Sequence, residues 1–241
     1  MEKLLDEIES YWSTRTEGYS EVNHKELAGT QKNAWLKVLT SQFPDKPKEE
    51  IRILDIGTGP GFFPVILAEA GYHVDAVDYT EGMLEKAKEN AGELCRNIHF
   101  QRMDAQKLEF EDNTFDVVIS RNLTWNLEHP DVAYREWVRV LKVGGKLLNF
   151  DANWYGYLYE EEQRKAYEND RKNVENNSLD DHYLCTDIER MERIALQVPL
   201  SKIRRPEWDV KTLREAGLLG IHTDTEIWKT VWSEEERLNY Q

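Results

Sequence analysis

Apolar residues follow two different periods along the middle of the chain, and the two periods alternate. Short unbroken apolar runs, which are typical of strands buried on both faces, occupy residues 51–56, 72–78, 97–101, 115–120 and 146–150. Between them, apolar residues recur three and four positions apart and predict helices, at residues 62–68, 80–95 and 130–141. Strands that alternate with helices predict an α/β fold in which helices cover both faces of a parallel sheet.

The N-terminal segment lies outside this alternation. Residues 4–12 and 31–43 carry apolar stripes at helical spacing, and the aromatic-rich stretch 11–19 between them predicts a loop. Nothing here indicates an independent domain. We therefore expect residues 1–50 to form a helical cap on a core that spans 51–153.

The last third of the chain breaks the rhythm again. Residues 154–206 hold charged, helix-prone runs and are too long for a simple connection. We interpret them as a lid-like insertion over the site; a solvated arm and a dimerisation surface are the alternatives, and a homodimer stays open. Residues 207–241 predict a helix followed by one or two strands.

Composition narrows the class of protein. The 241 residues are 40% hydrophobic, enough for one α/β domain, and no apolar run approaches the length of a membrane span. The acidic N-terminus lacks the apolar region of a signal peptide, and Cys95 and Cys185 form neither a metal nor a disulfide pattern, so we expect a cytoplasmic protein without a metal. A net charge of −15 repels phosphate backbones, and the basic run 202–205 is short, so nucleic acid is not expected as a partner.

Three glycines at alternate positions, Gly57, Gly59 and Gly61, join the first strand to the helix that follows it. Glycine accepts positive φ and lets a ligand approach the backbone without a Cβ in the way. The helix start that follows also offers free N–H groups to a polar ligand. A plain strand-to-helix turn needs one glycine, so three predict a ligand site.

The order of further features extends this pattern. The glycine turn, the acid Asp78 at the end of the second strand, the pair Asp104-Ala105 after the third strand and a turn at 141–145 follow one another at a spacing that resembles class I S-adenosylmethionine-dependent methyltransferases. The resemblance covers about residues 51–150 and is nearest to the small-molecule branch. It implies a Rossmann-like, doubly wound sheet of seven strands with the last strand antiparallel.

The resemblance also implies S-adenosyl-L-methionine as cofactor and assigns it a set of contacts. A carboxylate such as Asp78 is an acceptor-only group that suits the two hydroxyls of a ribose, and Asp104 with the Ala105 N–H suits an adenine edge. For Asp55 a purely structural role is an open alternative, and for Met83 a core role is. The expected cofactor-binding residues are Tyr19, Asp55, Gly57, Thr58, Gly59, Gly61, Asp78, Tyr79, Met83, Asp104, Ala105 and Asn122.

Two loops at the carboxyl ends of the strands remain for a small-molecule methyl acceptor. Both are rich in aromatic and amide side chains, and the expected substrate contacts are Trp125, Asn153, Trp154 and Tyr157, with packing under the insertion as the alternative for the aromatic residues. A general base is needed only if the acceptor carries a proton that must leave. The candidates for that role are His129, Asp151 and His182.

Other functions stay open at this point. A nicotinamide-dependent oxidoreductase would use a similar sheet. The dinucleotide-binding motif of such enzymes, however, has a glycine at the position where this chain has Phe62. A non-catalytic cofactor-binding protein and a methyltransferase acting on protein or RNA are further alternatives, and the charge of −15 disfavours the RNA version most.

Overall fold

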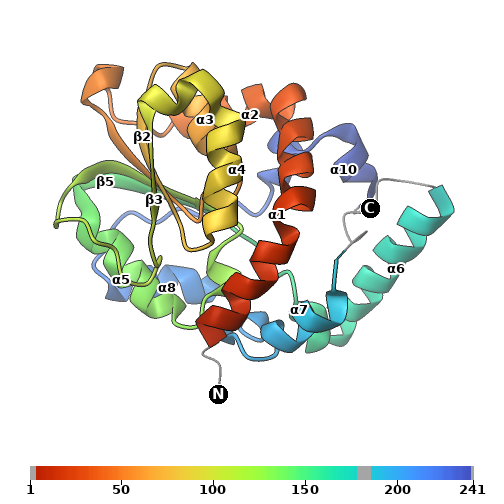
Figure 1. Cartoon of the computed structure of the whole chain (residues 1–241). Coiled ribbons are helices and arrows are strands. Elements are labelled where there is room, and N and C mark those ends of the chain that lie inside the picture. The colour runs from red at the N-terminus through yellow and green to blue at the C-terminus, as the bar shows by residue number, and fades with distance from the viewer. Residues whose placement is uncertain (1–3, 178–185, 240–241) are drawn as a thin grey trace.

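The structure, a computed structural model, describes residues 4–177 and 186–239 and is built on one parallel sheet (Figure 1). The five strands lie in the order β3-β2-β1-β4-β5, and each neighbouring pair is parallel. Their bounds are β1 (Arg52–Ile56), β2 (His73–Asp78), β3 (Ile98–Arg102), β4 (Phe115–Arg121) and β5 (Leu141–Phe150).

Helices cover both faces of this sheet. The α-helices are α1 (Leu4–Ala28), α2 (Gln31–Thr40), α3 (Phe62–Glu69), α4 (Glu81–Ala91), α5 (Pro130–Val140), α6 (Glu161–Asn177), α7 (Ile188–Ala195), α8 (Glu207–Glu215), α9 (Trp228–Val231) and α10 (Glu234–Asn239). Short 3₁₀ helices are η1 (Lys48–Glu50), η2 (Gly92–Asn97), η3 (Thr124–Asn126), η4 (Gly156–Leu158) and η5 (Pro199–Ser201).

Successive residues of the central strands point to opposite faces of the sheet and belong to two separate apolar layers. Leu54 and Val118 point to the layer that holds Trp137 of α5, whereas Ile53 and Val117 point to the opposite layer with α2 and α3. This division follows from the period of two along a strand. The predicted α/β architecture, a parallel sheet between two helical layers, is confirmed.

The predicted number of strands is wrong for the described residues. The sheet has five strands and no antiparallel one, and the segment 220–232, where one or two strands were predicted, runs as an irregular stretch into α9. The residues of that segment do not alternate between a buried and an exposed face: residues 222–226 are all exposed. They therefore lack the half-buried surface that a strand presents.

The predicted loop at 11–19 is also wrong, because α1 runs through it without interruption. The C-terminal half of α1 buries a stripe at helical spacing, formed by Thr16, Ser20, Asn23 and Glu26. The stripe is polar, so it gave no apolar signal, and it packs on α4, where the Asn90 amide donates to the Ser20 hydroxyl at 3.3 Å.

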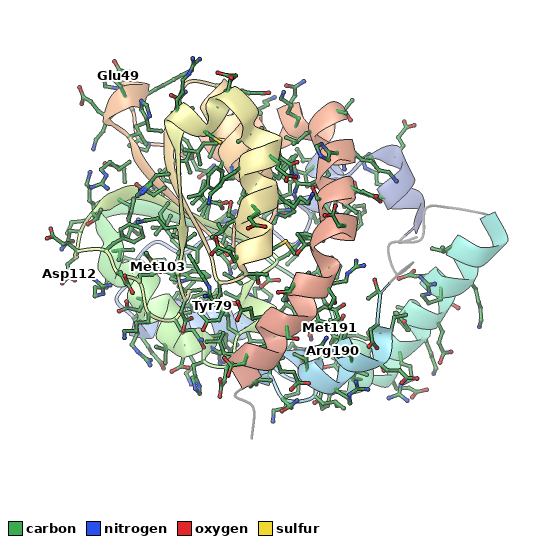
Figure 2. The ribbon with its side chains drawn as sticks, in the orientation of Figure 1. Glu49, Tyr79, Met103, Asp112, Arg190 and Met191 are labelled. Carbon is green, nitrogen blue, oxygen red and sulfur yellow. The ribbon has the colours of Figure 1, made fainter. Side chains whose placement is uncertain are left out.

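The described part of residues 154–206 forms helices, of which α7 lies beside α1 and α6 stands farther from it (Figure 1). The α7 helix contacts the N-terminal half of α1: the Arg190 guanidinium donates to the Ser10 hydroxyl at 2.9 Å, and the buried Met191 lies in one apolar cluster with Ile8 and Tyr11 (Figure 2). In the parts of the chain that the structure describes, no helix is both long enough and apolar enough to cross a membrane.

Candidate active site

A pocket opens at the carboxyl ends of β1, β2 and β4, under the N-terminal half of α1. Its space, the open mouth included, measures about 820 Å³. Nine of the twelve expected cofactor residues line it: Tyr19, Gly57, Gly59, Asp78, Tyr79, Met83, Asp104, Ala105 and Asn122. The pocket lies where open α/β sheets hold their ligands.

The glycine turn forms the floor of the pocket. Gly57 and Gly59 both have positive φ, of 70° and 52°. A Cβ at Gly57 would lie 2.7 Å from a methyl carbon of Leu123, and a Cβ at Gly59 would lie 3.6 Å from the ring of Tyr19. Glycine at position 57 therefore lets Leu123 pack closely on the turn, whereas a Cβ at position 59 would only reach ordinary contact with Tyr19.

The three remaining residues of the expected set lie behind the turn. Gly61, with φ of 91°, precedes α3, and a Cβ there would meet Ala87 of α4 at 3.0 Å, so this glycine serves helix packing. Thr58 is buried, and its backbone N–H donates to Val77 at 3.0 Å. Asp55 is buried in β1. None of the three lines the pocket.

Two carboxyl groups, the half-buried Asp78 in the pocket lining and the buried Asp55 behind it, give the floor its electrostatic character. Asp78 accepts from the Gly59 N–H at 2.8 Å and from the Thr80 N–H at 2.9 Å, which ties the turn to the end of β2. Burial raises the pKa of Asp78, against the effect of these N–H donors. Burial also raises the pKa of Asp55 to about 7, and the neighbouring Asp78 carboxylate adds to that shift.

The ends of β2 and β3 form a second wall. Tyr79 and Met103, both labelled in Figure 2, line the pocket. Asp104 accepts from the Gln106 backbone N–H at 2.8 Å through Oδ1, and its Oδ2 has no partner among the described residues. The indole of Trp137 donates to the Ala105 carbonyl at 2.9 Å and fixes this loop. The wall therefore presents an aromatic ring and a fixed carboxylate side by side.

An arginine holds Tyr79 against α1. The Arg102 guanidinium lies 4.9 Å from the centre of the Tyr79 ring and donates to the Tyr79 carbonyl at 2.8 Å. It also donates to the Glu9 carboxylate of α1 at 2.7 Å. A cation on the ring face and an ion pair thus join the wall of the pocket to the helix above it.

The third wall is the segment after β4. Asn122 has φ of 56°, a left-handed conformation that asparagine tolerates better than most residues. Before it, Arg121 is bonded by both of its terminal nitrogens to the Glu26 carboxylate of α1, at 2.5 and 3.2 Å, and its guanidinium lies 5.0 Å from the ring of Trp35. Burial would lower the pKa of Arg121, but Glu26 raises it above its ordinary value.

Sequence reasoning did not assign several lining residues. These are Leu5, Ile8, Glu9, Thr80, Met103, Gln106, Arg121, Leu123, Asn126, Leu127 and Glu128. Thr80, Met103 and Gln106 adjoin assigned positions, so their place in the chain was a usable signal. Glu9 comes from a helix whose path was predicted only in part.

The expected substrate residues pack with one another and do not line the pocket. Trp125 stacks on Tyr155 with ring centres 5.0 Å apart and donates from its indole to the Asn122 carbonyl at 2.9 Å. Tyr157 stacks on Tyr167 and donates to Glu192 at 2.9 Å. Like Asn153 and Trp154, they lie outside the pocket lining. Their substrate role stays a prediction, and for Trp125 and Tyr157 the geometry is that of packing.

The two base candidates that the structure describes are also absent from the pocket lining. His129 precedes α5 with its side chain 62% exposed. Asp151 is buried in an ion pair with Arg205 at 3.0 Å and accepts from the Trp125 N–H at 2.9 Å. These contacts make Asp151 part of a structural network. His182 lies outside the described residues.

Known proteins resemble the part of the chain that forms this site. Residues 54–149 match the model of a family described as a methyltransferase domain. The demethylmenaquinone methyltransferase of Clavibacter sepedonicus is 39% identical over 97 residues, which are 40% of this chain and 39% of that protein. The ubiquinone biosynthesis O-methyltransferase of Coxiella burnetii is 30% identical over 126 residues, which are 52% of this chain and 53% of that protein. The chain thus matches about half the length of its curated relatives.

A solved structure extends the likeness to most of the fold. A candidate S-adenosyl-L-methionine-dependent methyltransferase from Methanococcus maripaludis superposes with a TM-score of 0.59, over 85% of this chain and 84% of that one, at 22% identity. At that identity the likeness establishes the fold. Residues 54–149, which carry the glycine turn and the strands around it, match a methyltransferase domain, in agreement with the family that the motifs predicted, and the chain shares the fold of this solved structure.

Proposed function

We propose that the protein transfers a methyl group from S-adenosyl-L-methionine to a small-molecule acceptor. The observation that carries the proposal is a single pocket that combines the glycine turn, the Asp78 carboxylate and the Asp104-Ala105 loop. The names of the two quinone-pathway relatives support a small acceptor. S-adenosyl-L-methionine would supply a methyl group bonded to a positively charged sulfur. The acceptor's lone pair would bond to the methyl carbon, and the sulfur would leave on the opposite side.

The residues present fit this cofactor by their chemistry. Asp78 is engaged by one N–H at each carboxylate oxygen, and each oxygen retains a lone pair for a ribose hydroxyl. The unpaired Oδ2 of Asp104 suits an adenine amine. The bare backbone at Gly57 and Gly59 leaves room for the amino-acid tail, and the Tyr19 ring above Gly59 suits a cation.

The protein's own part in the reaction is to align and to exclude water. In-line displacement gains most when the reacting atoms are held in contact and in register. The N-terminal half of α1 covers the pocket through Leu5, Ile8 and Trp12, and apolar side chains there keep water away from the reacting centre. No general base is required if the acceptor presents a free lone pair.

Cofactor binding is tested by Asp78→Ala in titration calorimetry with S-adenosyl-L-methionine. Loss of a charged acceptor for two hydroxyls should weaken binding by roughly 1.5–3 kcal/mol, on the order of ten- to a hundred-fold. The matched control is Asp112→Ala, an acid with an exposed side chain far from the pocket, which should bind as the wild type does (Figure 2). Equal affinity for wild type and Asp78→Ala would contradict the assignment.

Methyl transfer itself is tested by a metabolite screen that measures S-adenosylhomocysteine release. Turnover with at least one small molecule is the expected result. Tight cofactor binding with release only in the presence of protein or RNA would contradict the small-molecule acceptor and leave the cofactor assignment intact.

A further inference from the structure

One polar side chain in the pocket has no partner that the cofactor assignment explains. Asn126, the last residue of η3, is 4% exposed and lines the pocket. Its Oδ1 atom is buried and has no hydrogen-bond partner among the described residues. An unpaired buried acceptor costs free energy, so such a group is usually explained by something that binds it.

The turn that carries Asn126 is held rigidly. The Asn126 backbone N–H donates to the Leu123 carbonyl at 3.0 Å. The preceding Thr124 hydroxyl and the Trp125 N–H both donate to the buried Asp151 carboxylate. Because both preceding residues are fixed, the Asn126 amide is placed before any ligand arrives, as a recognition group should be.

The position of Asn126 separates it from the cofactor contacts. The glycine turn, Asp78 and the Asp104 loop belong to the β1, β2 and β3 side of the pocket. Asn126 comes from the β4 side, together with Leu123, Leu127 and Glu128. Asn122 on that wall is an expected cofactor contact, so the rest of the wall, with Asn126 in it, is the part of the lining left for the methyl acceptor.

The charges around the pocket decide which acceptors are compatible. Its described lining holds no lysine and no histidine, and its arginine, Arg121, is paired with Glu26. The nearby Arg102 is paired with Glu9. Three further carboxylates, Asp78, Asp104 and Glu128, also line the site. An anionic acceptor would meet these charges without a free cation, whereas a group that donates hydrogen bonds would be attracted.

We propose that Asn126 recognises the methyl acceptor and that the acceptor is a primary or secondary amine, whose N–H donates to the Asn126 carbonyl oxygen. This inference rests on the proposed function and deepens it. With one N–H held by Asn126, the nitrogen lone pair is turned toward the methyl group. An amine that binds in its neutral form presents that lone pair without the need for a general base.

The step balances without a further reagent. The amine lone pair forms a bond to the methyl carbon while the carbon–sulfur bond breaks and its electron pair goes to sulfur. The products are S-adenosylhomocysteine and a methylated ammonium ion, which releases a proton to solvent.

The test uses acceptors of one size and different chemistry. Benzylamine, N-methylbenzylamine, N,N-dimethylbenzylamine, phenol and benzoate are each given to the full-length protein with S-adenosyl-L-methionine, and S-adenosylhomocysteine release is measured. Turnover is expected with the first two compounds, at a KM at least tenfold lower than for the tertiary amine, and none with benzoate.

Variants assign the effect to the residue. Asn126→Leu keeps the volume but removes the acceptor, and should raise the KM for benzylamine about tenfold; Asn126→Asp keeps an acceptor oxygen and should preserve amine turnover. The matched control is Gln101→Ala on β3, another amide with a buried unpaired oxygen but outside the pocket lining, which should leave KM unchanged.

The two proposals fail in different ways. Calorimetry without an acceptor reports on cofactor binding alone, and a negative result there overturns the proposed function and this inference with it. Binding of S-adenosyl-L-methionine followed by turnover of phenol or benzoate in preference to the amines overturns only the amine inference. So does an unchanged KM in Asn126→Leu, or an absence of both turnover and binding with every amine.

Discussion

Asp55 shows how the strand that carries the glycine turn sets the chemistry of a single side chain. Asp55 is the last residue but one of β1 and is 3% exposed. Burial raises its pKa from 3.8 to about 7. A carboxyl group in this state is largely protonated at pH 5 in the folded protein and ionised in the unfolded chain. The folded state therefore binds more protons between these pKa values, and the free energy of unfolding falls as pH rises through that window.

We expect Asp55→Asn to remove this pH dependence. Between pH 5 and pH 8 the wild type should lose about 2–3 kcal/mol from Asp55, and the variant should not. The measurement is urea unfolding at both pH values. The control is Asp116→Asn: burial would raise the pKa of Asp116, but Lys142 and Lys46 lower it to about 2, so its contribution is constant over the same window. Parallel pH curves for wild type and Asp55→Asn would contradict the expectation.

At the scale of elements, α1 is held at its C-terminal end by an ion pair that few water molecules reach. The side chain of Glu26 is 7% exposed and that of Arg121 is 23% exposed. Breaking such a pair by removing one partner leaves a buried charge without compensation.

Glu26→Gln should therefore destabilise the protein by about 3 kcal/mol, measured by urea unfolding. The double variant Glu26→Gln/Arg121→Met should recover part of that loss, because no uncompensated charge remains. Glu17→Gln is the control on the same helix: Glu17 pairs with Lys86 at 2.9 Å but its side chain is 79% exposed, so the change should cost less than 1 kcal/mol. Equal losses in the two single variants would show that the Glu26 pair behaves as a surface pair.

The elements that sequence reasoning found and missed differ in one physical respect. The strands and the helices between them bury apolar residues such as Leu54, Val118 and Trp137. The spacing of these residues in the sequence therefore predicts both the element and its buried face. The second half of α1 buries Thr16 and Glu26 instead, and a polar stripe has no hydrophobic period to detect. This half of α1 is held instead by contacts with residues far away in the sequence, such as Asn90 and Arg121, which the local sequence pattern does not reveal.

The same difference separates the predicted and unpredicted parts of the site. The glycine turn and Asp78 follow strands directly, so the order of elements alone places them at the sheet edge. Asn126 lies in the pocket because a 3₁₀ turn redirects the chain after β4, and nothing in the residue types around it indicates that turn. Trp125, one residue earlier, faces the opposite way and packs on Tyr155.

At the scale of the whole molecule, residues 154–206 act on the pocket through α1. They supply none of its described lining, but α7 contacts the N-terminal half of α1, which does line it. We infer that the described part of the insertion supports the cover of the pocket from behind, and the lid expected from sequence stays a prediction.

Met191→Ala tests this support. Met191 is 1% exposed, and its truncation should cost 2–5 kcal/mol in the free energy of unfolding. Because α1 would lose its backing, the affinity for S-adenosyl-L-methionine should also fall, as measured by calorimetry at a temperature where the variant is folded. Leu213→Ala on α8 is the control: it truncates a buried residue of a different apolar layer and should lower stability without weakening binding. Unchanged affinity in Met191→Ala would disconnect the insertion from the pocket.

The contacts of α1 at its two ends would allow the helix to rotate as a rigid body about its C-terminal end. Glu26 fixes one end to β4, whereas Leu5 and Glu9 reach over the pocket near the other. Twenty-one residues separate Leu5 from Glu26, a span of about 32 Å in a straight helix. A rotation of about 10° around the Glu26 end would carry Leu5 through roughly 5 Å, since arc length is span times angle. The mouth of the pocket at Leu5 would then widen while every hydrogen bond within α1 stays closed, at the cost of the Glu9–Arg102 ion pair.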